Sequence, residues 1–295
     1  MSKINVLTHL EDFTFFNSCY LEFISKKHFN LLVYDADVSY DSASTIIATN
    51  CLNKHQWFSQ LNGFKILIDN TWEIPQPSDL VDSHCCFSQN FFWYNESLHY
   101  QHLGLDKYTP NKTYNKLALV PMRLKKKSRD QLFQKLPLDK CIYSYNGIGH
   151  CLPDDDNNDN RYFNSQWYND TYFSISAETV VTGDQLFITE KTFKPIAFYH
   201  PFMVAGQPGV LYHLKQLGFE TYDNMFDESY DSMPDYSDRI TKIIDNLNSF
   251  NPVAYDKITQ EKIEYNRNRF FNRQLVTEKF EQEIIQPIIE YFETK

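Results

Sequence analysis

The chain has 295 residues, more than a single domain usually contains, so two domains are expected. Hydrophobic residues make up 42% and aromatic residues 16%, which excludes a largely disordered chain, and the net charge of −10 disfavours nucleic acid as a general partner. No stretch approaches the roughly 18 apolar residues of a membrane span, and no secretory signal segment is visible, so we expect a soluble, cytoplasmic protein.

Short apolar runs that end in polar residues mark the first part of the chain. They lie at Ile4 to Thr8, Phe29 to Tyr34 and Phe64 to Asp69. This pattern is typical of buried parallel strands whose carboxyl ends open on a ligand cleft. We therefore predict an N-terminal Rossmann-like domain over residues 1–112, followed by a linker at Pro110 to Thr113.

An apolar strand, a basic turn and a helix open the second part. The strand is predicted at Leu117 to Pro121, and the turn from Arg123 to Arg129 holds five cations in seven residues. Such a run is either a solvated turn or a surface that binds phosphate groups. Further strands are predicted at Lys140 to Tyr145, Tyr172 to Ala177 and Pro201 to Ala205.

Helices close the chain. The apolar spacing predicts them at Asp238 to Leu247, Lys262 to Leu275 and Glu278 to Phe292. The alternation of strands and helices predicts an α/β fold with a second Rossmann-like domain over residues 113–275 and a C-terminal helix over residues 276–295.

The most informative motif is Thr189-Glu190-Lys191, within the run from Leu186 to Ile196. It predicts a polar helix start that leads into the buried strand at Pro201 to Ala205. A helix N-terminus presents free N–H groups and the positive end of the helix dipole, and it therefore binds phosphate readily. Because Lys191 adds a full charge, the pattern indicates a nucleotide-type ligand.

Three segments taken in order resemble the donor-binding signature of the α1,3-fucosyltransferase-like glycosyltransferases, in a phage-type form. Phe173 to Glu178 corresponds to a strand that ends in Phe-Glu-Asn in that signature. Ile188 to Lys191 corresponds to its Thr-Glu-Lys helix start, and His200 to Val204 corresponds to its Val-Pro-Val-Val strand. The chain departs from that signature at Glu178-Thr179, and its interval between Glu178 and Glu190 is longer.

The resemblance implies a fold and an activity. The fold is of the GT-B type, with two Rossmann-like domains that face a cleft holding a nucleotide-sugar, and with C-terminal helices. The activity is an inverting, metal-independent transfer of sugar from a nucleotide-diphosphate sugar, with no further cofactor. The acceptor hydroxyl would belong to a glycan or to a hydroxymethylated base of phage DNA, for which the basic turn offers contacts.

The resemblance also implies which residues bind the donor. Lys191 and Arg129 correspond to cations on the diphosphate, with Arg123 as the alternative to Arg129, although each could instead form a surface ion pair. Glu190, which Thr189 precedes at the helix start, would accept hydrogen bonds from ribose hydroxyls or cap the helix.

Carboxylates complete the implied site. Glu178 is expected near the donor sugar. The catalytic base is expected in a turn after a strand of the first domain, and Glu73, followed by Pro75, has that place. Glu96 and Asp37 are the alternatives, and Glu73 could instead begin a solvated loop.

Two rival hypotheses remain open. Asp35-Ala36-Asp37 has the Asp-x-Asp spacing of a divalent-metal site, which would make the enzyme a metal-dependent glycosyltransferase. A non-catalytic nucleotide-sugar-binding protein would keep the cleft without the chemistry. The six cysteines include no Cys-x-x-Cys pair, so they favour buried free thiols over a zinc site.

Overall fold

The structure is a computed structural model that describes residues 4–8, 29–33, 45–49, 65–69, 83–87, 90–150, 152, 164–183, 186–286 and 290. The chain divides into two compact units. We call Met1–Leu103 together with Arg273–Lys295 the N-terminal unit, and Gly104–Asn272 the central unit. This division assigns residues 273–295 to the N-terminal unit, whereas the sequence pattern set residues 276–295 apart; the domain limits at residues 112 and 275 stay a prediction.

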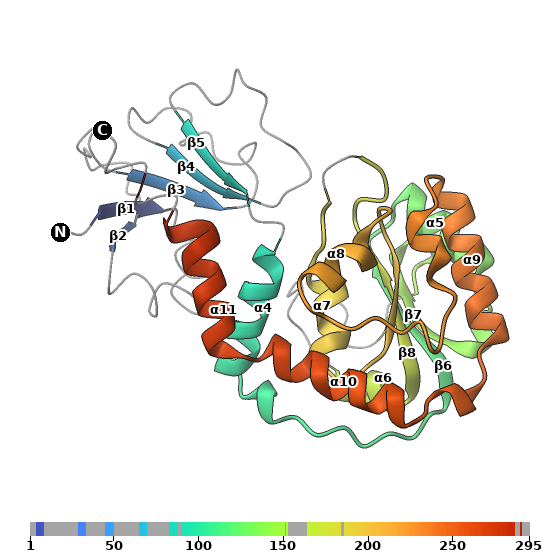
Figure 1. Ribbon diagram of the computed structural model, residues 1–295. Helices are drawn as coiled ribbons and strands as arrows, with labels where there is room; N and C mark the ends of the chain where they lie inside the picture. Colours follow the sequence, from blue (N-terminus) through green and yellow to red (C-terminus); the bar gives the residue numbers. More distant parts are fainter. Residues whose placement is uncertain are drawn as a thin grey trace. The chain divides into compact units, whose positions relative to one another are not determined.

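The N-terminal unit contains a parallel sheet in the order β2-β1-β3-β4-β5 (Figure 1). Its strands are β1 (Ile4–Thr8), β2 (Phe29–Val33), β3 (Thr45–Thr49), β4 (Lys65–Asp69) and β5 (Ser83–Phe87). The strands β1, β2 and β4 confirm the three predicted runs, while β3 and β5 were not predicted. The order reverses between β1 and β3, as it does in doubly wound α/β sheets.

Two helices from distant parts of the sequence pack together within this unit. They are α4 (Phe91–His102) and α11 (Arg273–Phe280), and α11 continues into the π-helical turn η8 (Glu281–Ile285). Tyr94 meets Phe280 edge-on, with ring centroids 6.1 Å apart. Asn90 Nδ2 donates to Glu283 Oε2 at 3.0 Å. Burial, and then the charge of Glu283, raise the pKa of Tyr94, so its hydroxyl stays protonated.

The single helix predicted over Lys262 to Leu275 is wrong. Instead, α10 (Lys257–Phe270) ends before Asn272 and α11 begins at Arg273. The Asn272 N–H bonds the carbonyl of Arg269 at 3.2 Å, a tightened last turn that satisfies a terminal helix carbonyl. The same residues mark the passage of the chain from the central unit back to the N-terminal unit.

The central unit contains a four-stranded parallel sheet in the order β7-β6-β8-β9. Its strands are β6 (Lys116–Arg123), β7 (Cys141–Tyr145), β8 (Thr171–Ala177) and β9 (Phe202–Ala205), and each confirms a predicted strand. The order reverses between β6 and β8. In open α/β sheets, ligands bind outside the carboxyl ends of the strands at such a reversal.

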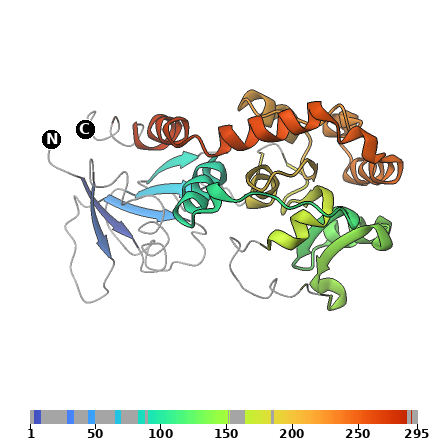
Figure 2. The same cartoon turned by 90° about the horizontal axis from the view of Figure 1, so that it is seen from below.

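Helices cover both faces of this sheet. The helices α5 (Lys127–Lys135) and α9 (Tyr236–Ser249) pack together on one face, and α7 (Glu190–Ala197) and α10 pack on the other (Figure 1). In both views α10, in orange, runs alongside α7, in gold (Figure 2). The shorter elements are η3 (Leu105–Lys107), η4 (Leu138–Lys140), η5 (Asn146–Ile148), α6 (Ser165–Asn169), α8 (Val210–Gln216), η6 (Glu228–Ser232) and η7 (Pro252–Ala254).

The core of the central unit lies between the sheet and these helices. Residues with no exposed surface include Leu119, Phe173, Ile175, Met203, Ile243 and Leu247. Their burial removes apolar surface from water at about 25 cal/mol per Å². The packed sheet therefore provides a rigid base for the loops at its carboxyl edge.

Candidate functional site

A distorted strand end leads into the basic turn. Pro121, which has no N–H to donate, lies where the pairing register of β6 with β7 shifts. Arg123, two residues later, has a φ of 47°, in the left-handed region that side chains other than glycine rarely adopt. The chain thus bends at the carboxyl end of β6 before α5 begins.

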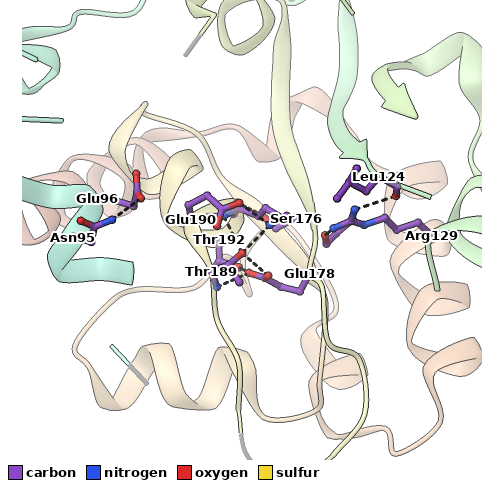
Figure 3. Close-up of polar contacts among 11 residues, drawn as sticks. Asn95, Glu96, Leu124, Arg129, Ser176, Glu178, Thr189, Glu190 and Thr192 are labelled. Atoms are coloured by element: carbon purple, nitrogen blue, oxygen red, sulfur yellow. Dashed lines mark hydrogen bonds and ion pairs between the residues drawn. The ribbon is translucent and has the colours of Figure 1, made fainter. Parts of the chain in front are cut away.

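Arg129, in the first turn of α5, bridges the two strands at the reversal of the sheet. Its Nη1 donates to the carbonyl of Leu124 at 3.1 Å, and its Nη2 donates to the carbonyl of Ala177 at 3.3 Å (Figure 3). The side chain is 2% exposed, and its Nε has no hydrogen-bond partner among the described residues. A buried donor without a partner costs free energy, so this guanidinium has a hydrogen bond to offer a ligand.

The start of α7 is held by a carboxylate from the neighbouring strand end. Glu178, directly after β8, is 1% exposed and accepts three hydrogen bonds (Figure 3). They come from the N–H of Thr189 at 3.0 Å, its hydroxyl at 2.6 Å and the hydroxyl of Thr192 at 2.7 Å. A Cβ on Gly206 would lie 3.3 Å from Glu178 Cβ, so a glycine at the end of β9 leaves room for this side chain. These bonds fix the position of the helix start.

A proline within α7 adds a second attachment to β8. Pro195 has no N–H, so the carbonyl of Lys191, four residues earlier, loses its usual helical donor. The hydroxyl of Ser176 takes that place and donates to this carbonyl at 2.8 Å. The proline therefore ties the first turn of α7 to the carboxyl end of β8.

Glu190 and Lys191 form an ion pair in that first turn. Lys191 Nζ lies 2.6 Å from Glu190 Oε1, and the two side chains are 22% and 7% exposed. Burial alone would raise the pKa of Glu190, but the charge and hydrogen bond of Lys191 and the charge of Lys194 lower it overall. Glu190 is therefore an ionised hydrogen-bond acceptor, and Lys191 keeps surface for a second anionic partner.

A third cation, Lys126, lies close to Arg129 and Lys191. Burial, followed by the charges of Arg129 and Lys191, lowers the pKa of Lys126, the residue before α5. Burial also lowers the pKa of Arg129, while the charges of Glu178 and Glu190 oppose that change. We call Lys126, Arg129 and Lys191 the cation cluster. Sequence reasoning did not single out Lys126, although it lies within the basic run.

The structure describes two of the remaining sequence-predicted residues, Arg123 and Glu96. Arg123 is half-buried at the end of β6. Glu96 lies on α4 in the N-terminal unit, is 2% exposed and accepts a hydrogen bond from Asn95 Nδ2 at 3.1 Å (Figure 3). Glu73, Asp35 and Asp37 lie outside the described residues.

Two features are absent from the described part of the chain. There, no group of three His, Cys, Asp or Glu side chains is placed to hold a metal ion. None of the helices in the same ranges combines the length and apolar character that crossing a bilayer requires.

Comparison with solved structures gives the fold a known class. The chain is similar to the crystal structure of α1,3-fucosyltransferase, with a TM-score of 0.50 and 11% identity over 92% of this chain and 91% of that one. The crystal structure of α1,3-fucosyltransferase with GDP gives a TM-score of 0.50 and 10% identity over 92% of each chain. The structure with GDP-fucose gives a TM-score of 0.44 and 10% identity over 92% of this chain and 90% of that one.

The chain thus has an α/β fold with parallel sheets of the kind seen in α1,3-fucosyltransferases, which confirms the predicted α/β fold of the GT-B type. The cleft between two facing domains stays a prediction. At 10–11% identity the likeness defines the fold alone. No protein-family model matches the sequence, and no curated protein is significantly similar to it.

Proposed function

We propose that this protein is a glycosyltransferase that uses a nucleoside-diphosphate sugar as its donor. The observation that carries the proposal is the cation cluster of Lys126, Arg129 and Lys191 beside the start of α7. Glycosyl transfer leaves negative charge on the departing diphosphate, and preorganised cations facing that charge stabilise the transition state. The fold supports the same conclusion, since a similar solved structure is a fucosyltransferase with GDP.

Each residue of the site then has a separate task. The Nε of Arg129 and the exposed part of Lys191 bind the diphosphate oxygens, and Lys126 adds the third charge. The ionised carboxylate of Glu190 accepts hydrogen bonds from the ribose hydroxyls. Glu178 acts through α7: because its oxygens already accept bonds from two threonines, it positions the helix start below the donor.

The catalytic base is proposed from the sequence. A carboxylate that removes the acceptor proton must reach the acceptor hydroxyl. Glu73 follows a predicted strand of the first domain and precedes Pro75, which is the place that the resemblance gives the base, and Glu96 is the alternative. Inversion at the sugar carbon, a cleft between two domains and an acceptor that is a glycan or a phage DNA base are parts of the same proposal.

Nucleotide binding tests the donor site before any acceptor is known. GDP or UDP at about a hundredfold excess over its dissociation constant should raise the free energy of unfolding by roughly 2.7 kcal/mol, while guanosine and uridine should do much less. This rise in the free energy of unfolding should persist in the presence of EDTA, because protein cations take the place of a metal ion at the diphosphate. Its loss on chelation would instead favour the metal-dependent rival with Asp35 and Asp37.

Variants of the cation cluster test whether its residues bind the diphosphate. In calorimetric titration, Lys191→Ala and Lys126→Ala should each weaken diphosphate binding roughly tenfold to a hundredfold, because a charge-assisted contact is worth about 1.5–3 kcal/mol. Arg129→Lys should also weaken binding, since lysine lacks the planar fork. Lys135→Ala, at the other end of α5, is the matched control. Wild-type affinity in all three cluster variants would refute the donor site.

A further inference from the structure

The central unit contains a cavity of about 520 Å³ away from the cation cluster. Its walls come from the segment before β6, from the turn between α7 and β9, and from α10 with the residues that precede it. The first two wall segments lead into the amino ends of β6 and β9, whereas the cluster lies at the carboxyl ends of β6 and β8. Because the strands are parallel, the cavity lies at the amino ends of the strands of this sheet and the cluster lies at their carboxyl ends.

Two tyrosines in the cavity wall have strained backbones. Tyr114 has a φ of 55° and Tyr199 a φ of 56°, both in the left-handed region that bulky side chains avoid. Each ring is held by a neighbour: Tyr114 stacks on Tyr172 with centroids 4.2 Å apart, and the guanidinium of Arg267 lies 4.3 Å from the centroid of Tyr199. Strain that the surroundings maintain in this way concentrates at binding sites.

The aromatic surfaces of the cavity are not parallel. Tyr255 is a third ring in the wall, and it meets Tyr114 at 64° with centroids 5.6 Å apart. One face of Tyr114 is already covered by Tyr172. A flat nucleobase prefers a parallel surface on which to stack, whereas a puckered sugar ring can place C–H groups against rings at different angles.

Four ionisable side chains contribute to the cavity wall. Lys112, Lys257, Glu261 and Glu264 line the cavity, and Lys257 pairs with Glu261 at 3.5 Å. Lys112 Nζ donates to the carbonyl of Tyr168 at 2.8 Å. Burial lowers the pKa of Lys112 to about 7, so near neutral pH much of this amine is uncharged and can accept a hydrogen bond as well as donate one. With Lys112 largely uncharged and Lys257 paired with Glu261, the wall carries little net positive charge to attract an anion, which favours a ligand without net charge.

We propose that this cavity binds a neutral saccharide, with its C–H faces against Tyr114, Tyr199 and Tyr255 and its hydroxyls on Lys112 and Glu264. Sugar hydroxyls both donate and accept hydrogen bonds, so they can satisfy an amine and a carboxylate in one site. The inference does not depend on the donor site, because the cavity lies at the amino ends of the strands, opposite the cation cluster. It goes beyond sugar transfer by adding a second site that holds a glycan away from the reaction.

Neutral oligosaccharides test the proposal directly. Maltohexaose, cellohexaose, chitohexaose and mannohexaose are screened by saturation-transfer NMR without any nucleotide, and the strongest binder is titrated by calorimetry. Tyr114→Gly and Tyr199→Gly should each weaken its binding about tenfold or more. Glycine suits a positive φ, so both variants remove a ring without adding backbone strain.

Control variants and competing ligands separate a saccharide site in this cavity from a nonspecific aromatic surface. Tyr265→Ala, which removes an exposed ring of the same α10 helix, should leave sugar binding unchanged. GDP affinity should stay at the wild-type value in both glycine variants. Failure of all four sugars to bind at millimolar concentration, or binding that both glycine variants retain, would overturn the proposal. Tighter binding of adenosine or of a heparin hexasaccharide, lost in the same variants, would overturn it in favour of a base or an anion.

Discussion

The removal of one charge at Glu178 should destabilise the central unit measurably. In Glu178→Gln the amide oxygen can keep the bonds from the Thr189 N–H and the Thr192 hydroxyl, and the amide N–H can donate to the Thr189 hydroxyl once that hydroxyl turns. What is lost is the charge at the N-terminus of α7 and the charge assistance of the bonds. Since a hydrogen bond to a charged group exceeds a neutral one by about 1 kcal/mol and the helix-end charge adds up to about 2, we expect a loss of about 1–3 kcal/mol.

The truncation Glu178→Ala should cost more, roughly 3–5 kcal/mol, because it leaves a buried N–H without its acceptor and opens a cavity. Urea unfolding followed by far-UV circular dichroism measures both losses. Glu220→Gln, an exposed carboxylate of the same unit, is the control and should stay within about 0.5 kcal/mol of the wild type.

A double-mutant cycle isolates the contact itself. Thr192→Val keeps the shape of a fully buried side chain and removes one of the three donors. Combined with Glu178→Gln, it should reveal a coupling of about 0.5–2 kcal/mol. If Glu178→Gln and Glu178→Ala both match the Glu220→Gln control, the reasoning that this carboxylate holds the start of α7 is refuted.

Two further predictions concern the ionisation of Lys112 and proton removal by Glu73. Burial lowers the pKa of Lys112 to about 7 from 10.5, so between those values the unfolded chain binds more protons, and the free energy of unfolding gains up to about 1.4 kcal/mol per pH unit. Lys112→Met should remove that rise between pH 7 and pH 9, whereas Lys135→Met should not; parallel urea-stability profiles for the wild type and Lys112→Met would contradict it. Glu73→Gln should bind donor normally but slow sugar transfer by about 10²–10⁴-fold. Normal turnover in that variant, with Glu96→Gln inactive, would transfer the base role to Glu96.

The sequence predicts those strands that are continuous apolar runs. Leu117 to Pro121 and Pro201 to Ala205 are recognisable because a strand buried on both faces needs apolar residues throughout. The strand β3 was missed because its apolar part, Ile46 to Ala48, is only three residues long between two threonines. The strand β5 was missed because Ser83–Phe87 combines polar and sulfur-containing residues and has no β-branched residue. The break at Asn272 was missed because apolar spacing continues across it.

The candidate site was likewise predictable from the sequence only in part. The start of α7 was predictable because a threonine cap and a Glu-Lys first turn are local signals. The bonds from Thr189 to Glu178 were not, since they join residues eleven positions apart across a loop whose path the sequence does not reveal. Lys126 could not be separated from its neighbours, because the cations of the basic run differ only in where the bent end of β6 directs them.

The division of the chain also sets an order of events during protein synthesis. Residues 104–272 form a continuous unit, so every contact within that unit is available once this stretch has left the ribosome. The N-terminal unit begins earlier but waits for α11, which packs on α4 and is translated only after residues 104–272. Until then α4 lacks the partner for the buried ring of Tyr94, so the N-terminal unit, whose translation starts first, is completed after the central unit.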